Sequence, residues 1–140
     1  MKNSLKLFAI LTLWINLNCK GQQMVQTTKD VNKFKINEQQ FINKPLKYLL
    51  KELKPQIKSA HAINDNPYFF NFRFRNPGQQ IKNEGSQEDR VSLYVYVKEP
   101  IDWVWEQRPK GNELIWTKED AEKYRNLTVV RIKVYTPPQE

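Results

Sequence analysis

The sequence predicts an α+β domain: one amphipathic helix packed on an antiparallel sheet of about four strands, with a second short helix before the last strand. Three observations lead to this fold class. Residues 91–98 alternate strictly between apolar and polar side chains, which is typical of a strand with one buried face. Residues 68–75 and 127–135 alternate in the same way. Within residues 45–54, leucines recur at the spacing of one helix face.

Each alternating stretch separates its side chains into two faces. In residues 91–98 one face is aliphatic, and the other carries two tyrosines and a lysine. We expect the helix to cover the aliphatic face, whereas the other face contacts water or a partner. In residues 127–135 the same alternation places Val130 and Ile132 on one face and Val129 on the other.

Shorter stretches complete the predicted sheet. Alternation around residues 34–36 indicates a short first strand, and residues 103–116 indicate a hairpin. Residues 57–63 are either a short strand or an irregular link. The polar residues 79–89 contain a single apolar side chain, and we expect them to form a mobile loop between two antiparallel strands.

The main helix is predicted for residues 45–54. Pro45 suits the first turn, where its missing N–H costs nothing, and Asn43 can cap the N-terminus. Pro55 ends the helix. The apolar stripe comprises Leu46, Leu49, Leu50 and Leu53.

Lysines at positions 47, 51 and 54 lie off this stripe. The simpler interpretation is a solvated face with cations near the negative end of the helix dipole. The alternative is a contact with lipid head groups. A second helix is predicted for residues 118–125, because Thr117 and Asp120 have the spacing of a capping box with Asp in place of Glu.

The composition supports one folded domain with a basic surface. The chain has 140 residues, 39% apolar and 12% aromatic, and a formal net charge of +8. Two of its 23 basic residues, Lys2 and Lys6, precede residue 19, and none of its 15 acidic residues does. The remainder therefore stays strongly basic, which suits an anionic partner such as an acidic protein, a glycan or lipid head groups.

The N-terminus has the order of a secretory leader. A basic start, residues 1–6, precedes an apolar run at residues 7–15 that is too short to span a bilayer. The run ends in Asn16-Leu17-Asn18-Cys19, and Cys19 is the only cysteine. Here the chain resembles bacterial lipoprotein precursors, with the looser cleavage box found in Bacteroidetes lipoproteins.

This resemblance implies removal of residues 1–18 as a signal peptide and acylation of Cys19. Residues 19–32 are then a lipidated cysteine followed by a flexible tether, and residues 33–140 form a single α+β domain. Layout and leader together are similar to small envelope lipoproteins, which implies attachment to the cell envelope, with the outer membrane favoured and its side left open. The alternatives are an ordinary secretory leader with an incidental cysteine, or a cytoplasmic protein with an apolar N-terminus.

Few residues in the sequence suit catalysis. With one histidine and one cysteine there is no metal-ligand spacing and no nucleophile-base pair, so we expect no metal, no cofactor and no enzymatic activity. Asp102 and Glu106 flank Trp103 and Trp105, and two carboxylates beside aromatic rings are the minimum equipment of a glycosidase. The alternative function is therefore a small hydrolase acting on envelope polysaccharide.

The uncovered face of the sheet is the candidate binding site. Tyrosine and arginine recur in binding hot spots, and arginine can grip carboxylate or phosphate with two hydrogen bonds. We expect a protein or an anionic glycan as partner; nucleic acid is not expected for an exported protein. The alternative is a merely solvated sheet face. The residues of this predicted face are Phe69, Arg73, Arg75, Tyr94, Tyr96, Lys98, Arg131, Lys133 and Tyr135.

Overall fold

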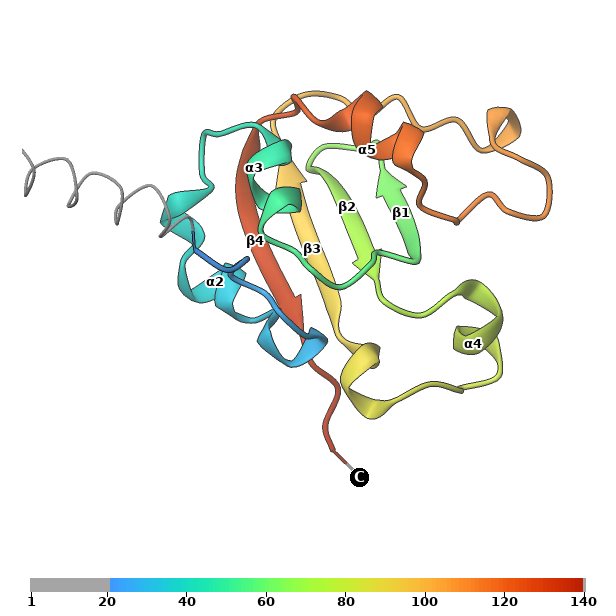
Figure 1. Ribbon diagram of the computed structural model, residues 1–140. Helices are drawn as coiled ribbons and strands as arrows, with labels where there is room; N and C mark the ends of the chain where they lie inside the picture. Colours follow the sequence, from blue (N-terminus) through green and yellow to red (C-terminus); the bar gives the residue numbers. More distant parts are fainter. Residues whose placement is uncertain (1–20, 140) are drawn as a thin grey trace, which may run out of the picture.

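Four strands form one antiparallel sheet in which neighbours in space are also neighbours in sequence (Figure 1). They are β1 (Ser59–Ile63), β2 (Tyr68–Arg73), β3 (Ser92–Val97) and β4 (Val129–Tyr135). The structure is a computed structural model and describes residues 21–139. Together with the helices this sheet confirms the predicted α+β class.

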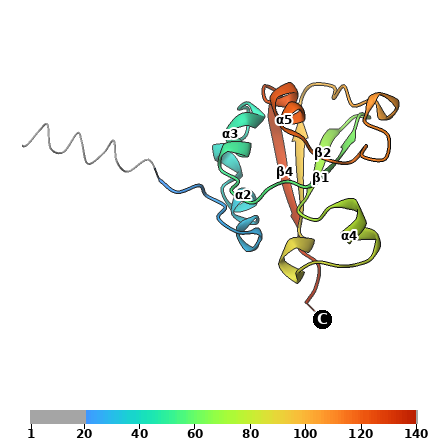
Figure 2. The same ribbon diagram turned by 45° about the vertical axis from the view of Figure 1, so that its right-hand side comes forward.

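The helices are short, and three of them gather on one face of the sheet. Figure 2 shows α2 and α3 on one side of the strands, and Figure 1 shows α5 beside α3. The α-helices are α2 (Lys33–Ile36), α3 (Leu46–Lys51), α4 (Pro77–Ile81) and α5 (Lys118–Tyr124). The 3-10 helices are η1 (Thr28–Asp30), η2 (Glu38–Gln40), η3 (Gln87–Arg90) and η4 (Trp105–Gln107).

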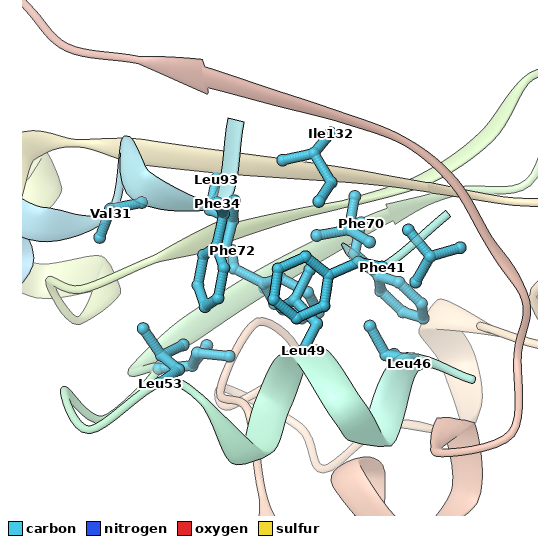
Figure 3. Packing of buried hydrophobic residues seen from close by; sticks show 14 of the residues in the cluster. Val31, Phe34, Phe41, Leu46, Leu49, Leu53, Phe70, Phe72, Leu93 and Ile132 are labelled. Atoms are coloured by element: carbon cyan, nitrogen blue, oxygen red, sulfur yellow. The ribbon is translucent and has the colours of Figure 1, made fainter. Parts of the chain in front are cut away.

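The core lies between the sheet and these helices. Phe70 and Phe72 of β2 are fully buried, and their rings stack with centroids 5.2 Å apart. Figure 3 shows the leucines of the α3 region pointing toward the sheet: Leu46 and Leu49 are completely buried, and Leu53 is 8% exposed. The predicted leucine stripe is therefore core, with Leu50 partly buried at its edge.

Helix α3 is shorter than predicted, and the N–H groups at its start find other hydrogen-bond acceptors than predicted. The N–H groups of Leu46 and Lys47 donate to the carbonyls of Leu127 and Arg125, each at 2.8 Å, so the turn before β4 serves as the cap. Asn43 does not cap the helix; it adopts a left-handed conformation with φ 63°.

The end of α3 is set by the N-terminal segment. After Lys51 the chain leaves the helix, and Val25 pairs with Leu53 as an isolated bridge. The Val25 N–H donates to the Glu52 carbonyl, and the Lys54 N–H donates to the Val25 carbonyl, both at 2.9 Å. Backbone pairing with another segment thus replaces the predicted last helical turn.

The same pairing corrects the predicted tether at residues 19–32. Val25 and Val31 are fully buried, and Thr28 is 8% exposed. Residues 24–32 are therefore part of the packed domain, although their composition is polar. The buried side chains of Val25 and Val31 attach a segment that otherwise has the composition of a linker, and Thr27, Lys29 and Asn32 within it stay exposed to solvent.

Two local predictions were wrong, and a third was confirmed only in part. Residues 34–36 belong to helix α2, because Phe34 enters the core whereas Ile36 is 74% exposed. Residues 103–116 form no hairpin: they run irregularly through η4, and Ile115 pairs with Ser59 of β1. The fourth strand is β1 instead. The segment 79–89 joins two antiparallel strands, β2 and β3, as predicted, but it is not a plain loop, because it contains the end of α4 and most of η3.

A bulge explains an error in the predicted faces of the last strand. Tyr96 is opposite Arg131, whereas the next residue of β3, Val97, is opposite Val129, so Val130 is an extra residue. Val129 is consequently buried together with Ile132, and Val130 is 39% exposed. Strict alternation cannot reveal such an insertion, because both residues are valine.

We predict that Leu49→Ala lowers the free energy of unfolding by about 2–5 kcal/mol, because it leaves a cavity in the centre of the core. Leu50→Ala is the matched control on the same helix and should cost clearly less, since Leu50 is only partly buried. Urea unfolding followed by circular dichroism measures both. Equal losses for the two variants would contradict the packing of α3 described above.

Candidate binding face

The open sheet face is the surface opposite α2, α3 and α5, and the strand register defines its residues. Three rows of side chains cross it from β1 to β4. All the residues of the predicted binding face lie in these rows except Arg75 and Lys98. The rows are Ser59, Arg73, Ser92 and Tyr135; His61, Asn71, Tyr94 and Lys133; and Ile63, Phe69, Tyr96 and Arg131.

Aromatic rings occupy the middle of the open sheet face. The ring of Phe69 lies 4.9 Å from that of Tyr96 and 6.0 Å from that of Tyr94, centroid to centroid. All three side chains are half-buried, because they pack against one another across β2 and β3. Contact across neighbouring strands fixes such rings in place, so little conformational freedom is lost when a partner binds them.

Positive charge lies directly beside these rings. The Arg131 guanidinium carbon and the Lys133 Nζ atom are each 5.6 Å from the centroid of the Tyr96 ring, and both side chains are exposed. No position in the three rows carries a carboxylate. The positive charges of the open sheet face therefore have no opposite charge within the rows, and the rings hold them at the edge of an apolar surface.

One corner of the face is covered. The side-chain amide of Gln80 on α4 donates to the Ser59 hydroxyl at 2.8 Å, and its oxygen accepts from the Arg73 guanidinium. Arg75 lies beyond β2 and donates to the Glu84 carbonyl at 3.0 Å. Lys98 is exposed and follows the last residue of β3. Arg131 and Lys133 are accordingly the least constrained basic residues of the predicted set.

One polar residue near the centre of the face, Asn71, was not singled out from the sequence. Asn71 sits between His61 and Tyr94, and its Oδ1 atom is buried without accepting a hydrogen bond from any described residue. Alternation with Phe69 and Arg73 places Asn71 on this face, but an asparagine alone gave no reason to select it.

The most buried ion pair of the described chain lies on the opposite side of the sheet. Arg108 grips Asp120 with two hydrogen bonds of 2.8 and 2.9 Å, and its guanidinium lies 3.7 Å from the centroid of the Trp103 ring. Arg108 also donates to the carbonyls of Glu113 and Ile115. This one side chain thus fixes the irregular segment between β3 and α5.

Asp120 has a second role in the predicted capping box, which is confirmed. Thr117 Oγ1 accepts from the Asp120 N–H at 3.1 Å, and Asp120 Oδ2 accepts from the Thr117 N–H at 3.0 Å. Burial by itself would raise the pKa of Asp120, but the hydrogen bonds from Arg108 and Thr117 outweigh burial and hold the pKa below its usual range. Asp120 is therefore ionised in the folded protein, and its carboxylate stabilises the fold.

The two carboxylates considered for hydrolysis, Asp102 and Glu106, do not line the same hollow. Asp102 is exposed and pairs with Lys123 at 3.3 Å. It lines a small hollow of about 140 Å³ with Trp103 and Tyr124, and Glu106 is not among the residues lining it. Trp103 instead packs edge-on against Phe70 of the core. In a glycosidase two carboxyl groups flank one cleft, whereas this hollow is lined by Asp102 without Glu106.

Neither a metal cluster nor a membrane-spanning helix is present in the described residues. Within residues 21–139, no three His, Cys, Asp or Glu side chains cluster closely enough to hold a metal ion. In the same part of the chain, no helix combines the length and apolar character needed to cross a bilayer. No protein-family model, curated protein or solved structure matches the chain.

We predict that Asp120→Asn destabilises the protein by about 3–5 kcal/mol at neutral pH, because it leaves Arg108 buried without its partner. The folded-state pKa of Asp120 is lowered, so its contribution is complete above the pKa of an unfolded aspartate, about 3.9, and is lost as the pH falls through the lower folded value. The stability gap between wild type and variant should therefore narrow in acid.

Thermal unfolding at a series of pH values measures this gap, with Glu119→Gln as control, since Glu119 is a neighbouring exposed carboxylate on the same helix. The control should follow wild type throughout. A gap that stays constant down to strongly acidic pH would show that the ion pair does not stabilise the fold in the way described.

Proposed function

We propose that this protein is a lipid-anchored component of the cell envelope that binds an anionic partner, a protein or a glycan, through its open sheet face, and is not an enzyme. The observation that carries the proposal is the open sheet face itself. It combines packed aromatic rings with Arg131 and Lys133, and its rows contain no carboxylate.

The geometry supports recognition of an anion for two reasons. Arg131 and Lys133 are exposed on an edge strand, so a bulky partner can reach them without displacing other chain segments. The neighbouring rings of Tyr94 and Tyr96 provide flat, partly apolar surface with hydroxyl groups that can donate or accept hydrogen bonds. Sugar rings with carboxylate groups and acidic peptide segments both suit this combination.

The proposed anchor rests on the leader. Cys19 and the segment before it lie outside the described residues, and their resemblance to lipoprotein precursors supports acylation at this cysteine. Anchoring by several acyl chains is stable, whereas one chain binds a membrane weakly. The outer membrane is the proposed location, and the side on which the domain lies is left open.

We predict that Arg131→Glu combined with Lys133→Glu weakens binding of an anionic polymer at least about tenfold, because two attractive contacts become repulsive. The probes are polygalacturonate for an anionic glycan and polyglutamate for an acidic protein segment, with neutral dextran as a blank. Isothermal titration calorimetry at low and high salt measures the affinities, which should fall with salt.

The control for this pair is Lys82→Glu combined with Lys110→Glu, which makes the same change in net charge at two exposed lysines outside the rows. The control should bind like wild type. Preference for one probe distinguishes a glycan from a protein partner. Equal losses in both double variants would reduce the effect to net charge and refute a specific face.

We predict that Cys19→Ser releases the protein from membranes or leaves an uncut precursor, because the serine cannot carry the thioether-linked lipid. Fractionation of cells shows where the protein resides, and intact mass spectrometry of wild type should show a chain beginning at an acylated Cys19. An unmodified Cys19 inside a longer mature chain would disprove the anchor.

A further inference from the structure

A second basic surface lies on the helix side of the sheet, where α3 and α5 meet (Figure 1). An open hollow of about 520 Å³ has Leu50 and Ala121 at its floor. Basic side chains from both helices line it: Lys47, Lys51, Lys118 and Arg125. We call the hollow and its lining the α3–α5 surface.

Two further hollows adjoin this one, and they also combine apolar or aromatic residues with lysines. Toward the end of α3, Leu50 and Lys118 also line a hollow of about 360 Å³ that includes Trp116 and Lys54. Toward the start of α3, Lys51 also lines a hollow of about 620 Å³ that includes Tyr48, a ring 48% exposed to solvent. Apolar and aromatic surface thus alternates with lysines along the whole exposed side of α3.

Few carboxylates oppose these charges. Glu122 lines the first hollow and pairs with Arg125 at 2.8 Å. Glu52 lines the third hollow, where its carboxylate accepts the Met24 N–H at 2.7 Å. No acidic residue lines the second hollow. The lysines of α3 therefore form no ion pair among the described residues and attract anions across the surface.

The start of the described chain lies at this surface. The Gln23 side-chain amide donates to the carbonyl of Lys51, the last residue of α3, at 3.0 Å. Cys19 is only four residues earlier in the sequence, a distance that the chain spans in at most about 14 Å. A lipid on Cys19 would therefore bring a bilayer within reach of α3.

We propose that the α3–α5 surface docks on anionic lipid head groups of the membrane that holds the protein. Lysine stems can lie along the apolar floor while their ammonium groups reach the phosphates, and Tyr48 suits the interface between head groups and acyl chains. Each lysine near an anionic membrane contributes roughly fivefold in affinity. The placement of the bilayer rests on the anchor proposed above, whereas the preference for anionic lipids rests on charge alone.

The test compares two double variants of equal charge, Lys51→Glu with Lys118→Glu on the surface and Lys82→Glu with Lys110→Glu away from it. The protein is purified from membranes with its own N-terminus and reconstituted into vesicles of phosphatidylcholine, alone or mixed with phosphatidylglycerol. An amine-reactive, membrane-impermeant reagent then labels lysines, and mass spectrometry measures the rate at each position.

The expected result is slow labelling of Lys47 and Lys54 on phosphatidylglycerol vesicles only. High salt, or the Lys51 and Lys118 changes, should restore fast labelling. With the Lys82 and Lys110 changes, labelling of Lys47 and Lys54 should stay slow. An anchored protein whose α3 lysines react equally fast on both vesicle types would overturn the inference and leave the anchor intact. Protection on both vesicle types would show a contact without lipid preference and overturn it equally.

Failure of the anchor gives a separate outcome. If the purified chain is not retained on phosphatidylcholine vesicles, its partition onto phosphatidylglycerol vesicles is measured instead. Partition that the Lys51 and Lys118 changes weaken by at least about tenfold supports the α3–α5 surface. Equal partition of both double variants refutes it. Inorganic phosphate added as a competitor should not displace the protein, since a single small anion cannot replace a charged lipid surface.

Discussion

The covering of one apolar sheet face determines most of this structure. Phe70, Phe72, Leu93 and Ile132 present a face that must be removed from water, yet the longest helix of the described chain, α5, has 7 residues. Helices of this length are not stable on their own and derive their stability from packing. Much of the cover is therefore irregular chain, whose backbone groups need partners that regular structure would otherwise supply.

Carboxylates supply these partners at several points. Glu38 accepts the Ile132 N–H at 2.8 Å, and Glu99 accepts both the N–H and the hydroxyl of Thr128. At each glutamate burial alone would raise the pKa, but these hydrogen bonds outweigh burial and lower it, together with Lys35 and Arg131 near Glu38 and Lys98 near Glu99. Together with Asp120, these acids attach connecting segments to the sheet and to α5. These three acidic side chains are withdrawn from the surface, which adds to the excess of 23 basic over 15 acidic residues in the sequence.

The sequence was informative where periodicity decides structure. Alternation identified β2, β3 and β4, the leucine stripe identified α3, and the pair Thr117 and Asp120 identified the start of α5, because each pattern reflects a local rule. Two of the failures share a different cause. Val25 and Phe34 lie in stretches that are mostly polar, and only contacts with distant residues decide that both are buried.

In the candidate binding face, too, local patterns predict some features and contacts between distant residues decide the others. Alternation was enough to place Tyr94 beside Tyr96 along one face, and strand pairing then brought Phe69 against both rings. The commitment of Arg75 to Glu84 and the covering of Arg73 by Gln80 depend on how the segment after β2 folds back, which no local pattern encodes. Arg131 and Lys133 emerge as the accessible cations only once these contacts are known.

The two basic surfaces have a geometric relation that follows from the layers. The α3–α5 surface belongs to the helix layer, and the open sheet face lies on the other side of the same sheet (Figures 1 and 2). A protein docked on a bilayer through α3 and α5 would therefore turn Arg131, Lys133 and the tyrosine rings away from the lipid. The sheet then separates a surface that sets orientation from a surface that remains available to a partner. A short link from Cys19 to the end of α3 strengthens this arrangement, because a long tether would let either side of the domain face the membrane.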